Sequence, residues 1–421
     1  FFAKSHTSMA ATPKRDEETG LLKSTAPTST PLGTGFNIFK NIVGSGILGI
    51  PFAIGELGVV VGFLFMAYSA CVSCLALWLI MQSVDMGKKV GIEDPYSYKA
   101  IGVAAFGERA GSIVDMIIMF YTAGCQVGYG VLVKDFLEGP LQQLFGAELG
   151  QVLLMCCALV IFLLCCLPSM DALKYTSLLG NLVLLYTVLL VIYEWYLHGL
   201  GVADGVVAVQ AITPKSLRVV GIFTGAFNFH YNMPVYYKGL QPTTPSSMIQ
   251  IIFKVLTMVV LFYVPIAVSG YLTFGGGIES NILKNFGTDT RFFICRLGLG
   301  FMIICSYPIV SSSTRAALGR MLWGDATDLP YSYQVCLSAV IVTVCLGVST
   351  VVPNFGVVLA YNGAVFGTAQ QLIFPAAAFY VLCKRVQPDP TMQNVALVLC
   401  ALGFICLCVG AGAQTYLLMN P

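Results

Sequence analysis

The chain has few charged residues and lacks the motifs that mark common enzyme classes. Only 10% of its 421 residues are Asp, Glu, Lys or Arg, whereas a soluble domain carries about 25%. There is no Walker-type phosphate loop, no cluster of metal ligands and no nucleophile–base arrangement. The chain also has no Asn-X-Ser/Thr glycosylation acceptor. We therefore expect neither an enzyme nor a cofactor, and no nucleic-acid partner.

Apolar residues are abundant instead, at 57% of the chain, and the mean hydropathy is +0.82. Apolar runs of 18 residues or more recur along the whole length, which is typical of an all-α, multi-pass membrane protein. The runs are continuous rather than alternating, which excludes a porin-type barrel. The fifteen cysteines fall in or beside these runs, so we interpret them as small packing residues. This includes Cys71 and Cys74, although they form a C-x-x-C motif.

The apolar runs predict eleven spans after a polar tail. Residues 1–34 are rich in Ser, Thr and Pro and are expected to be disordered, and residues 35–421 form the membrane domain. The predicted spans are 36–57, 59–84, 111–137, 149–167, 172–197, one that begins near 216, 249–274, 292–318, 331–351, 355–383 and 395–418. Of the 22 Lys and Arg residues, most fall on the side of the N-terminus in this topology. The positive-inside rule therefore places the N-terminus in the cytosol.

The first span contains a stretch that a helix should not contain. Between Gly44 and Pro51 there are three glycines and a proline, and each residue of either type weakens a helix interior. Broken backbone survives in a membrane only where it lines a cavity or is buried in protein. We expect the helix to unwind near Gly44, Ser45 and Gly46 and to resume near Ile47. Its second half would then point free amides at a small anion such as a carboxylate.

The sixth span has a second interruption, at residues 228–234. Transporters built from two inverted five-helix repeats carry broken helices at these corresponding positions, with substrate and ion between them. The spacing thus predicts repeats over about 35–200 and 215–383, with an extra helix at 395–418.

Several spaced motifs resemble the amino acid/auxin permease family of the amino acid–polyamine–organocation superfamily, especially its sodium-coupled neutral amino acid transporters and vacuolar relatives. The matching motifs are Asn41-Ile-Val-Gly-Ser-Gly-Ile-Leu-Gly-Ile-Pro51, Ala105-Phe-Gly107, Val235-Tyr-Tyr-Lys-Gly-Leu240, Gly270-Tyr-Leu-Thr-Phe-Gly275, Ser306-Tyr-Pro308 with Arg315, and Ile373-Phe-Pro375. The resemblance implies a LeuT-type fold with an eleventh helix. It also implies symport of amino acids by alternating access.

The resemblance implies a set of substrate contacts. The amides of Gly44, Ser45 and Gly46 would receive the substrate carboxylate, and carbonyls around the second break would receive its ammonium group. The residues at the second break are Phe227, Asn228 and Phe229. Three aromatic side chains are candidates for the wall around the substrate side chain, namely Tyr129, Phe229 and Tyr307, although aromatic residues in spans most often serve packing.

The resemblance implies that Asn41 and Ser306 bind sodium; the alternative is that they only bridge helices. Lys40 departs from the family pattern, and it either weakens the sodium site or extends to the cytosolic face. His230 and Glu56 are candidates for proton coupling, with structural roles as the alternatives. The coupling ion, sodium or proton, stays open.

The tail contains Glu17, Leu21 and Leu22, which resemble an acidic dileucine sorting signal that an adaptor protein could bind. The expected location is the plasma membrane or an endolysosomal or vacuolar membrane. Two other functions are considered: an uncoupled facilitator, and an amino acid sensor that signals through the tail.

Overall fold

The computed structural model describes residues 29–168, 174–241, 243–287, 289–324 and 330–420. Within them the chain is helical throughout, apart from one isolated parallel β-bridge between Ser29 and Leu240. The expected sorting residues Glu17, Leu21 and Leu22 lie outside the described residues.

Nine helical segments of the described chain are long and apolar enough to cross a membrane. They are α3 (Val59–Lys89), α5 (Glu108–Phe145), α6 (Ala147–Cys165), α7 (Lys174–Leu197), α10 (Pro245–Phe274), α11 (Thr290–Trp323), α12 (Tyr331–Val351), the stretch Phe355–Val386 and α15 (Pro390–Met419). The stretch Phe355–Val386 consists of α13 (Phe355–Asn362), the π-helical turns η6 (Gly363–Gly367) and η7 (Ala369–Ile373), and α14 (Phe374–Val386). The short elements between spans are α4 (Tyr98–Phe106), η4 (Gly275–Gly277) and η5 (Ile282–Asn285).

The predicted first and sixth spans are both broken. The first consists of α1 (Pro31–Ile42), the 3-10 helix η1 (Ser45–Gly49) and α2 (Ile50–Leu57), and its two halves are bent by 47°. The sixth consists of α8 (Pro214–Ala226), the 3-10 helix η3 (His230–Asn232) and α9 (Met233–Gly239). Because α1 begins at Pro31, after its N-cap Thr30, the predicted tail boundary at 34 and span start at 36 lie too late.

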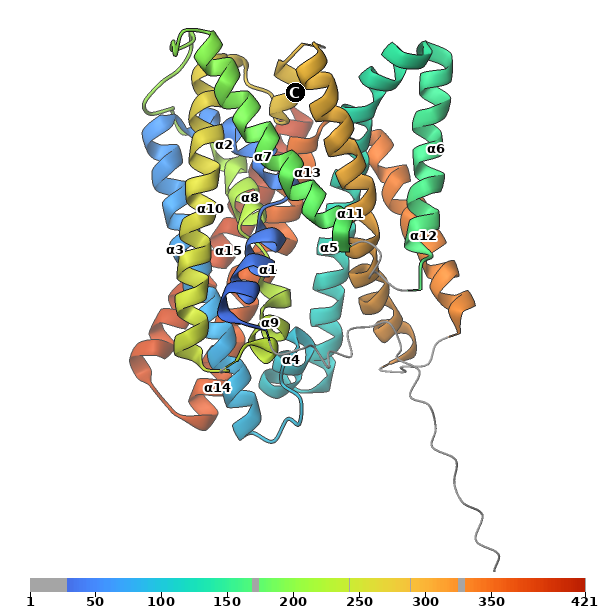
Figure 1. The fold of residues 1–421 in the computed structure, drawn as a ribbon. Helices are drawn as coiled ribbons and strands as arrows, with labels where there is room; N and C mark the ends of the chain where they lie inside the picture. The colour runs from blue at the N-terminus through green and yellow to red at the C-terminus, as the bar shows by residue number, and fades with distance from the viewer. Residues whose placement is uncertain (1–28, 169–173, 242, 288, 325–329, 421) are drawn as a thin grey trace, which may run out of the picture.

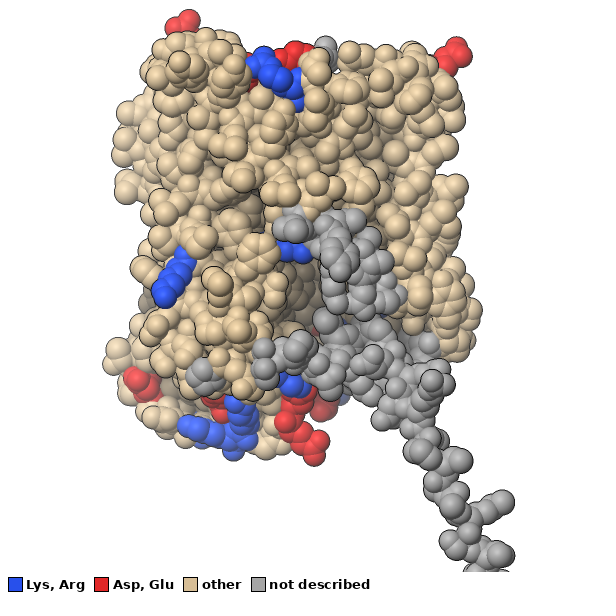
Figure 2. Space-filling view, in the orientation of Figure 1, with Lys and Arg blue, Asp and Glu red and all other residues tan. Residues whose placement is uncertain are grey.

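The helices form one upright bundle, in which α2 lies above α1 and α8 lies above α9 (Figure 1). The C-terminus lies near the upper end, whereas α4 and the turn between α14 and α15 lie at the lower end. Figure 2 shows charged side chains gathered at the two ends and a mostly uncharged band between them. Such a band is expected where the surface faces hydrocarbon.

A glycine crossing fixes α8 in the bundle. A Cβ added to Gly221 would lie 2.0 Å from the carbonyl oxygen of Ala360, and one added to Gly363 would lie 1.8 Å from the carbonyl oxygen of Gly221. The backbones of α8 and of the α13–η6 segment therefore touch directly, which only glycine permits. This contact sets the position of Ala226, where α8 ends.

Candidate functional site

The first break is a short stretch of extended backbone. Val43 has φ −79° and ψ 94°, and Gly44 has φ −132° and ψ −150°. Helical structure resumes at Ser45 as a 3-10 turn, two residues earlier than the predicted restart at Ile47. The amides of Gly44, Ser45 and Gly46 meet no backbone acceptor among the described residues, as expected for the first amides of a helix. A Cβ added to Gly44 would have no atom within 4 Å, so the break borders open space.

The second break begins where α8 ends at Ala226. Phe227 has φ −109° and ψ 10°, and Phe229 has φ −146° and ψ 14°. Both phenylalanine side chains are fully buried, and Asn228 is 7% exposed. The Asn228 side-chain nitrogen Nδ2 has no partner among the described residues. The break predicted at 228–234 thus begins one residue earlier than expected and leaves a buried donor available.

The two breaks lie side by side. A Cβ added to Gly46 would lie 3.5 Å from the Cα of Ala226. The hydroxyl of Tyr263, on α10, lies 3.0 Å from the carbonyl oxygen of Ala226 and 3.4 Å from that of Ile42. The start of η1 and the ends of α1 and α8 therefore converge. Two carbonyl acceptors released at helix ends therefore face one hydroxyl group, and the start of η1 lies beside them.

His230 lies at the second break and is fully buried. Its Nδ1 is 3.2 Å from Oδ1 of Asn228, and its Nε2 is 3.4 Å from both the hydroxyl and the carbonyl oxygen of Ser73 on α3. The Ser73 hydroxyl also donates to the Phe227 carbonyl, at 3.3 Å. The imidazole therefore connects the broken backbone to α3, which is the structural role that the sequence left open beside proton transfer.

The two predicted sodium ligands have different surroundings. The Asn41 side chain is exposed and donates from Nδ2 to the hydroxyl of Tyr236, on α9, over 2.9 Å. The side-chain oxygen Oδ1 of Asn41 is not used in this bond and can accept a hydrogen bond or coordinate a cation. Ser306 is half-buried on α11. The neighbouring Lys40 is half-buried as well. The bond between Asn41 and Tyr236 links the lower halves of the two broken spans.

Two of the predicted wall residues lie beside each other. The rings of Tyr129, on α5, and Tyr307, on α11, are 6.3 Å apart. Tyr307 is completely buried, and its hydroxyl has no partner among the described residues. The third, Phe229, lies in the second break itself.

Glu56 forms an ion pair with Arg218 across the upper halves of the two broken spans. Its Oε1 lies 3.0 Å from Nη2 of Arg218, whose guanidinium also lies over the ring of Phe52, 4.8 Å from its centre. Glu56 is therefore held at the end of α2 rather than exposed to solvent in the turn. Other acidic residues in spans are paired too: Asp115 with Arg320 and Glu194 with Arg291.

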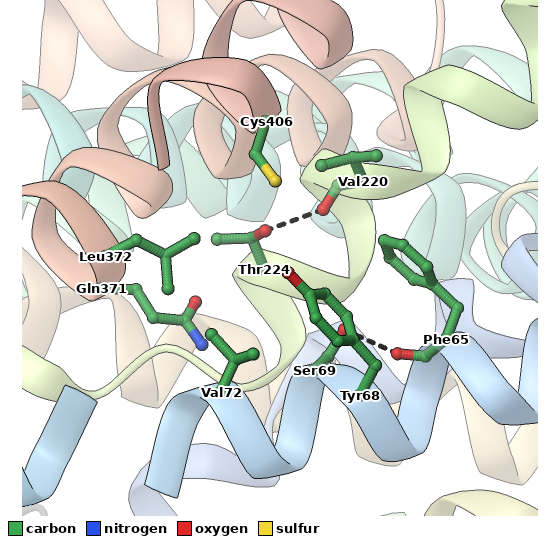
Figure 3. A pocket seen from close by; sticks show the side chains of 9 residues that line it. All are labelled: Phe65, Tyr68, Ser69, Val72, Val220, Thr224, Gln371, Leu372 and Cys406. Carbon is green, nitrogen blue, oxygen red and sulfur yellow. Dashed lines mark hydrogen bonds between the residues drawn. The ribbon is translucent and has the colours of Figure 1, made fainter. Parts of the chain in front are cut away.

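A small cavity lies near the second break, between α3, α8, η7 and α15 (Figure 3). It measures about 20 Å³, which is room for a water molecule. Gln371 lines it, is 3% exposed, and has no partner for Oε1 among the described residues. The sequence interpretation missed this residue. The signal was available, since Gln370 and Gln371 are adjacent amides in an apolar span, and they form part of a π-helical turn, a feature common at functional sites.

Two features of the described part of the chain concern metal ligands and cysteines. This part of the chain contains no group of three or more His, Cys, Asp or Glu side chains that could hold a metal ion. Cys71 and Cys74 are free thiols.

Comparison with known proteins gives a family match over nearly the whole chain. The model of the family described as "Transmembrane amino acid transporter protein" matches residues 27–420. A Bos taurus protein provisionally named sodium-coupled neutral amino acid transporter 11 is 26% identical over 392 residues, which cover 88% of this chain and 81% of that protein. Amino acid transporter AVT6E of Arabidopsis thaliana is 26% identical over 391 residues, covering 86% of this chain and 78% of that protein.

Among solved structures, the fold is similar to one described as the inward facing conformation of Mhp1. The TM-score is 0.58 at 12% identity, and the match covers 96% of both chains. Mhp1 is a LeuT-fold transporter, so the expected LeuT-type architecture is confirmed at the level of the fold.

Proposed function

Because this chain belongs to the transmembrane amino acid transporter family, which is a family of transporters and not of enzymes, we propose that it is a secondary active transporter for neutral amino acids, coupled to sodium or protons. The observation that carries the proposal is the convergence of the two breaks, with Gly46 packed on Ala226. Such a junction offers both donors and acceptors to a zwitterion in a region otherwise built of apolar helices.

The substrate carboxylate would bind the amides of Gly44, Ser45 and Gly46. These amides lie at the start of η1, where the helix dipole favours a negative charge. The ammonium group would bind carbonyls at the second break, around Phe227, Asn228 and Phe229. The open space beside Gly44 supports the first assignment, because a methyl group there would meet no protein atom.

The coupling ion would use either of two sets of groups. For sodium, Oδ1 of Asn41 and the hydroxyl of Ser306 are the proposed ligands, and the sodium-coupled name of the bovine relative supports this choice. For protons, His230 is the stronger candidate, because it is buried and its imidazole lies within hydrogen-bond distance of the Asn228 side chain at the second break. Glu56 is the weaker one, since its carboxylate is already bonded to Arg218.

We propose that this conformation is an inward-facing state and that the N-terminus is cytosolic. On the upper side, Asp135 on α5 accepts a hydrogen bond from its neighbour Asn281 and pairs with Lys284 of η5, at 3.1 and 3.2 Å. On the lower side Asn41 is exposed. The solved structure of similar fold carries the description inward facing. The membrane itself is proposed to be the plasma membrane or, as the name of vacuolar relatives suggests, an endolysosomal or vacuolar one.

The test is uptake of a labelled mixture of neutral amino acids into proteoliposomes under an imposed sodium gradient or an imposed proton gradient. Wild type is compared with Asn41→Ala and with Asn37→Ala, an exposed asparagine about one turn earlier on α1 that serves as the matched control. Sodium-driven uptake that only Asn41→Ala abolishes supports the sodium site. Proton-driven uptake that is indifferent to sodium would argue against Asn41 and Ser306 and leave His230 and Glu56 as the coupling candidates. Absence of gradient-driven uptake by wild type would refute the proposal.

A further inference from the structure

Tyr263 connects the ends of both interrupted helices through one hydroxyl group. The side chain projects from α10 and is completely buried. Its oxygen lies 3.0 Å from the carbonyl oxygen of Ala226, the last residue of α8, and 3.4 Å from that of Ile42, the last residue of α1. Its ring packs edge-to-face on Phe227, with 5.6 Å between ring centres. The tyrosine therefore contacts both breaks and is held in place by one of them.

The hydroxyl cannot satisfy both carbonyl groups at once. A tyrosine hydroxyl has one hydrogen to donate and lone pairs that accept. The shorter distance assigns the hydrogen to the carbonyl of Ala226, since hydrogen bonds weaken as they lengthen towards 3.5 Å. The Ile42 carbonyl and a lone pair on the hydroxyl oxygen are then both left as acceptors, 3.4 Å apart.

The electrostatics of this place favour a positive charge. The last carbonyls of α1 and α8 lie at the negative ends of two helix dipoles, each equivalent to roughly half an elementary charge. Both ends point at the same hydroxyl, in a buried region where water cannot screen them. The described residues that make these contacts with Tyr263, namely Ile42, Ala226 and Phe227, carry no cationic side chain.

We propose that Tyr263 is a positioning residue for a cationic group of the transported species. Its hydrogen fixes the Ala226 carbonyl, and its oxygen joins the Ile42 carbonyl as a ligand. The cationic group is either the substrate ammonium or the coupling ion, which share this chemistry. This inference rests on the proposed transport function and adds a residue that the sequence analysis did not select.

The test compares Tyr263→Phe, which removes one oxygen atom, with Tyr98→Phe. Tyr98 is the matched control: it is 3% exposed and donates to a backbone carbonyl, that of Gln370, over 2.6 Å, rather than to a carbonyl at the end of α1 or α8. Uptake into proteoliposomes is measured against amino acid concentration at saturating ion, and against ion concentration at saturating amino acid. Loss of a hydrogen bond to a charged group predicts a rise of about tenfold or more in one half-saturating concentration for Tyr263→Phe alone.

The outcomes separate the two sources of charge. A higher half-saturating amino acid concentration assigns the site to the ammonium group, and a higher half-saturating ion concentration assigns it to the coupling ion. Half-saturating concentrations equal to those of wild type in both series would overturn the inference while leaving the transport function intact. If wild type itself shows no uptake, the proposed function fails first. If Tyr263→Phe does not reconstitute, protection against thermal unfolding by the same amino acids is measured in detergent, with the same criteria.

Discussion

Replacing Gly221 by alanine tests whether the glycine crossing positions the second break. The added Cβ would lie 2.0 Å from the carbonyl oxygen of Ala360, so α8 and α13 must separate by about 1.4 Å to reach a 3.4 Å contact. Overpacking of a well-packed interior costs about 1–3 kcal/mol. We expect the upper part of this range, because the obstructing atom belongs to the backbone and cannot rotate away. The displacement also moves Ala226, so transport should fall with stability.

The assay is thermal unfolding of the purified protein together with amino acid uptake after reconstitution. Gly225→Ala is the matched control, since it lies one turn further along α8 and its added Cβ would be 3.8 Å from the Cα of Gly363, an ordinary contact. This control should unfold at the wild-type temperature or above it, because alanine favours helix by about 1 kcal/mol over glycine. Equal unfolding temperatures for Gly221→Ala and Gly225→Ala would refute the reasoning.

Two charged pairs give further predictions. Asp115→Asn removes the carboxylate that pairs with Arg320, whose side chain is 33% exposed. We therefore expect a loss of about 1.5–3 kcal/mol, the range for hydrogen bonds to charged groups, measured as a lower thermal unfolding midpoint. An unchanged midpoint would contradict a stabilising role for the pair. Glu56→Gln and Arg218→Gln should each lower the free energy of unfolding, and the double variant should lower it by less than the sum of the two. A double-mutant cycle should give a coupling energy of roughly 0.5–3 kcal/mol. Strictly additive losses would contradict the contact.

The positions of the helices followed from the sequence because hydrophobic thickness dictates their length. Uninterrupted apolar runs such as 59–84 and 331–351 predicted α3 and α12 within a few residues. The start of α1 was misplaced, because Pro31 and Gly33 looked like tail residues. In the structure Pro31 occupies the first turn after the Thr30 cap, where proline is well tolerated.

The paired roles of polar side chains were harder to predict. Glu56 and Arg218 are 162 residues apart in the chain, and nothing local to either indicates the partner. Asn41 was selected as an ion ligand from its motif, but its bond to Tyr236 requires α1 and α9 to be neighbours. Gln371 was not among the predicted site residues, because the stretch Phe355–Val386 is apolar on average and one buried amide hardly changes that average.

The sequence by itself determined the class of the protein, the number of apolar runs and the two places where helices break, because glycine, proline and charge have fixed energetic effects in hydrocarbon. Only the tertiary structure decided that the breaks meet. That result depends on the contact of Gly221 with Ala360 and on one hydroxyl, that of Tyr263, shared between two helix ends. Contacts between distant segments depend on how helices cross, and a linear pattern of residues does not contain that information.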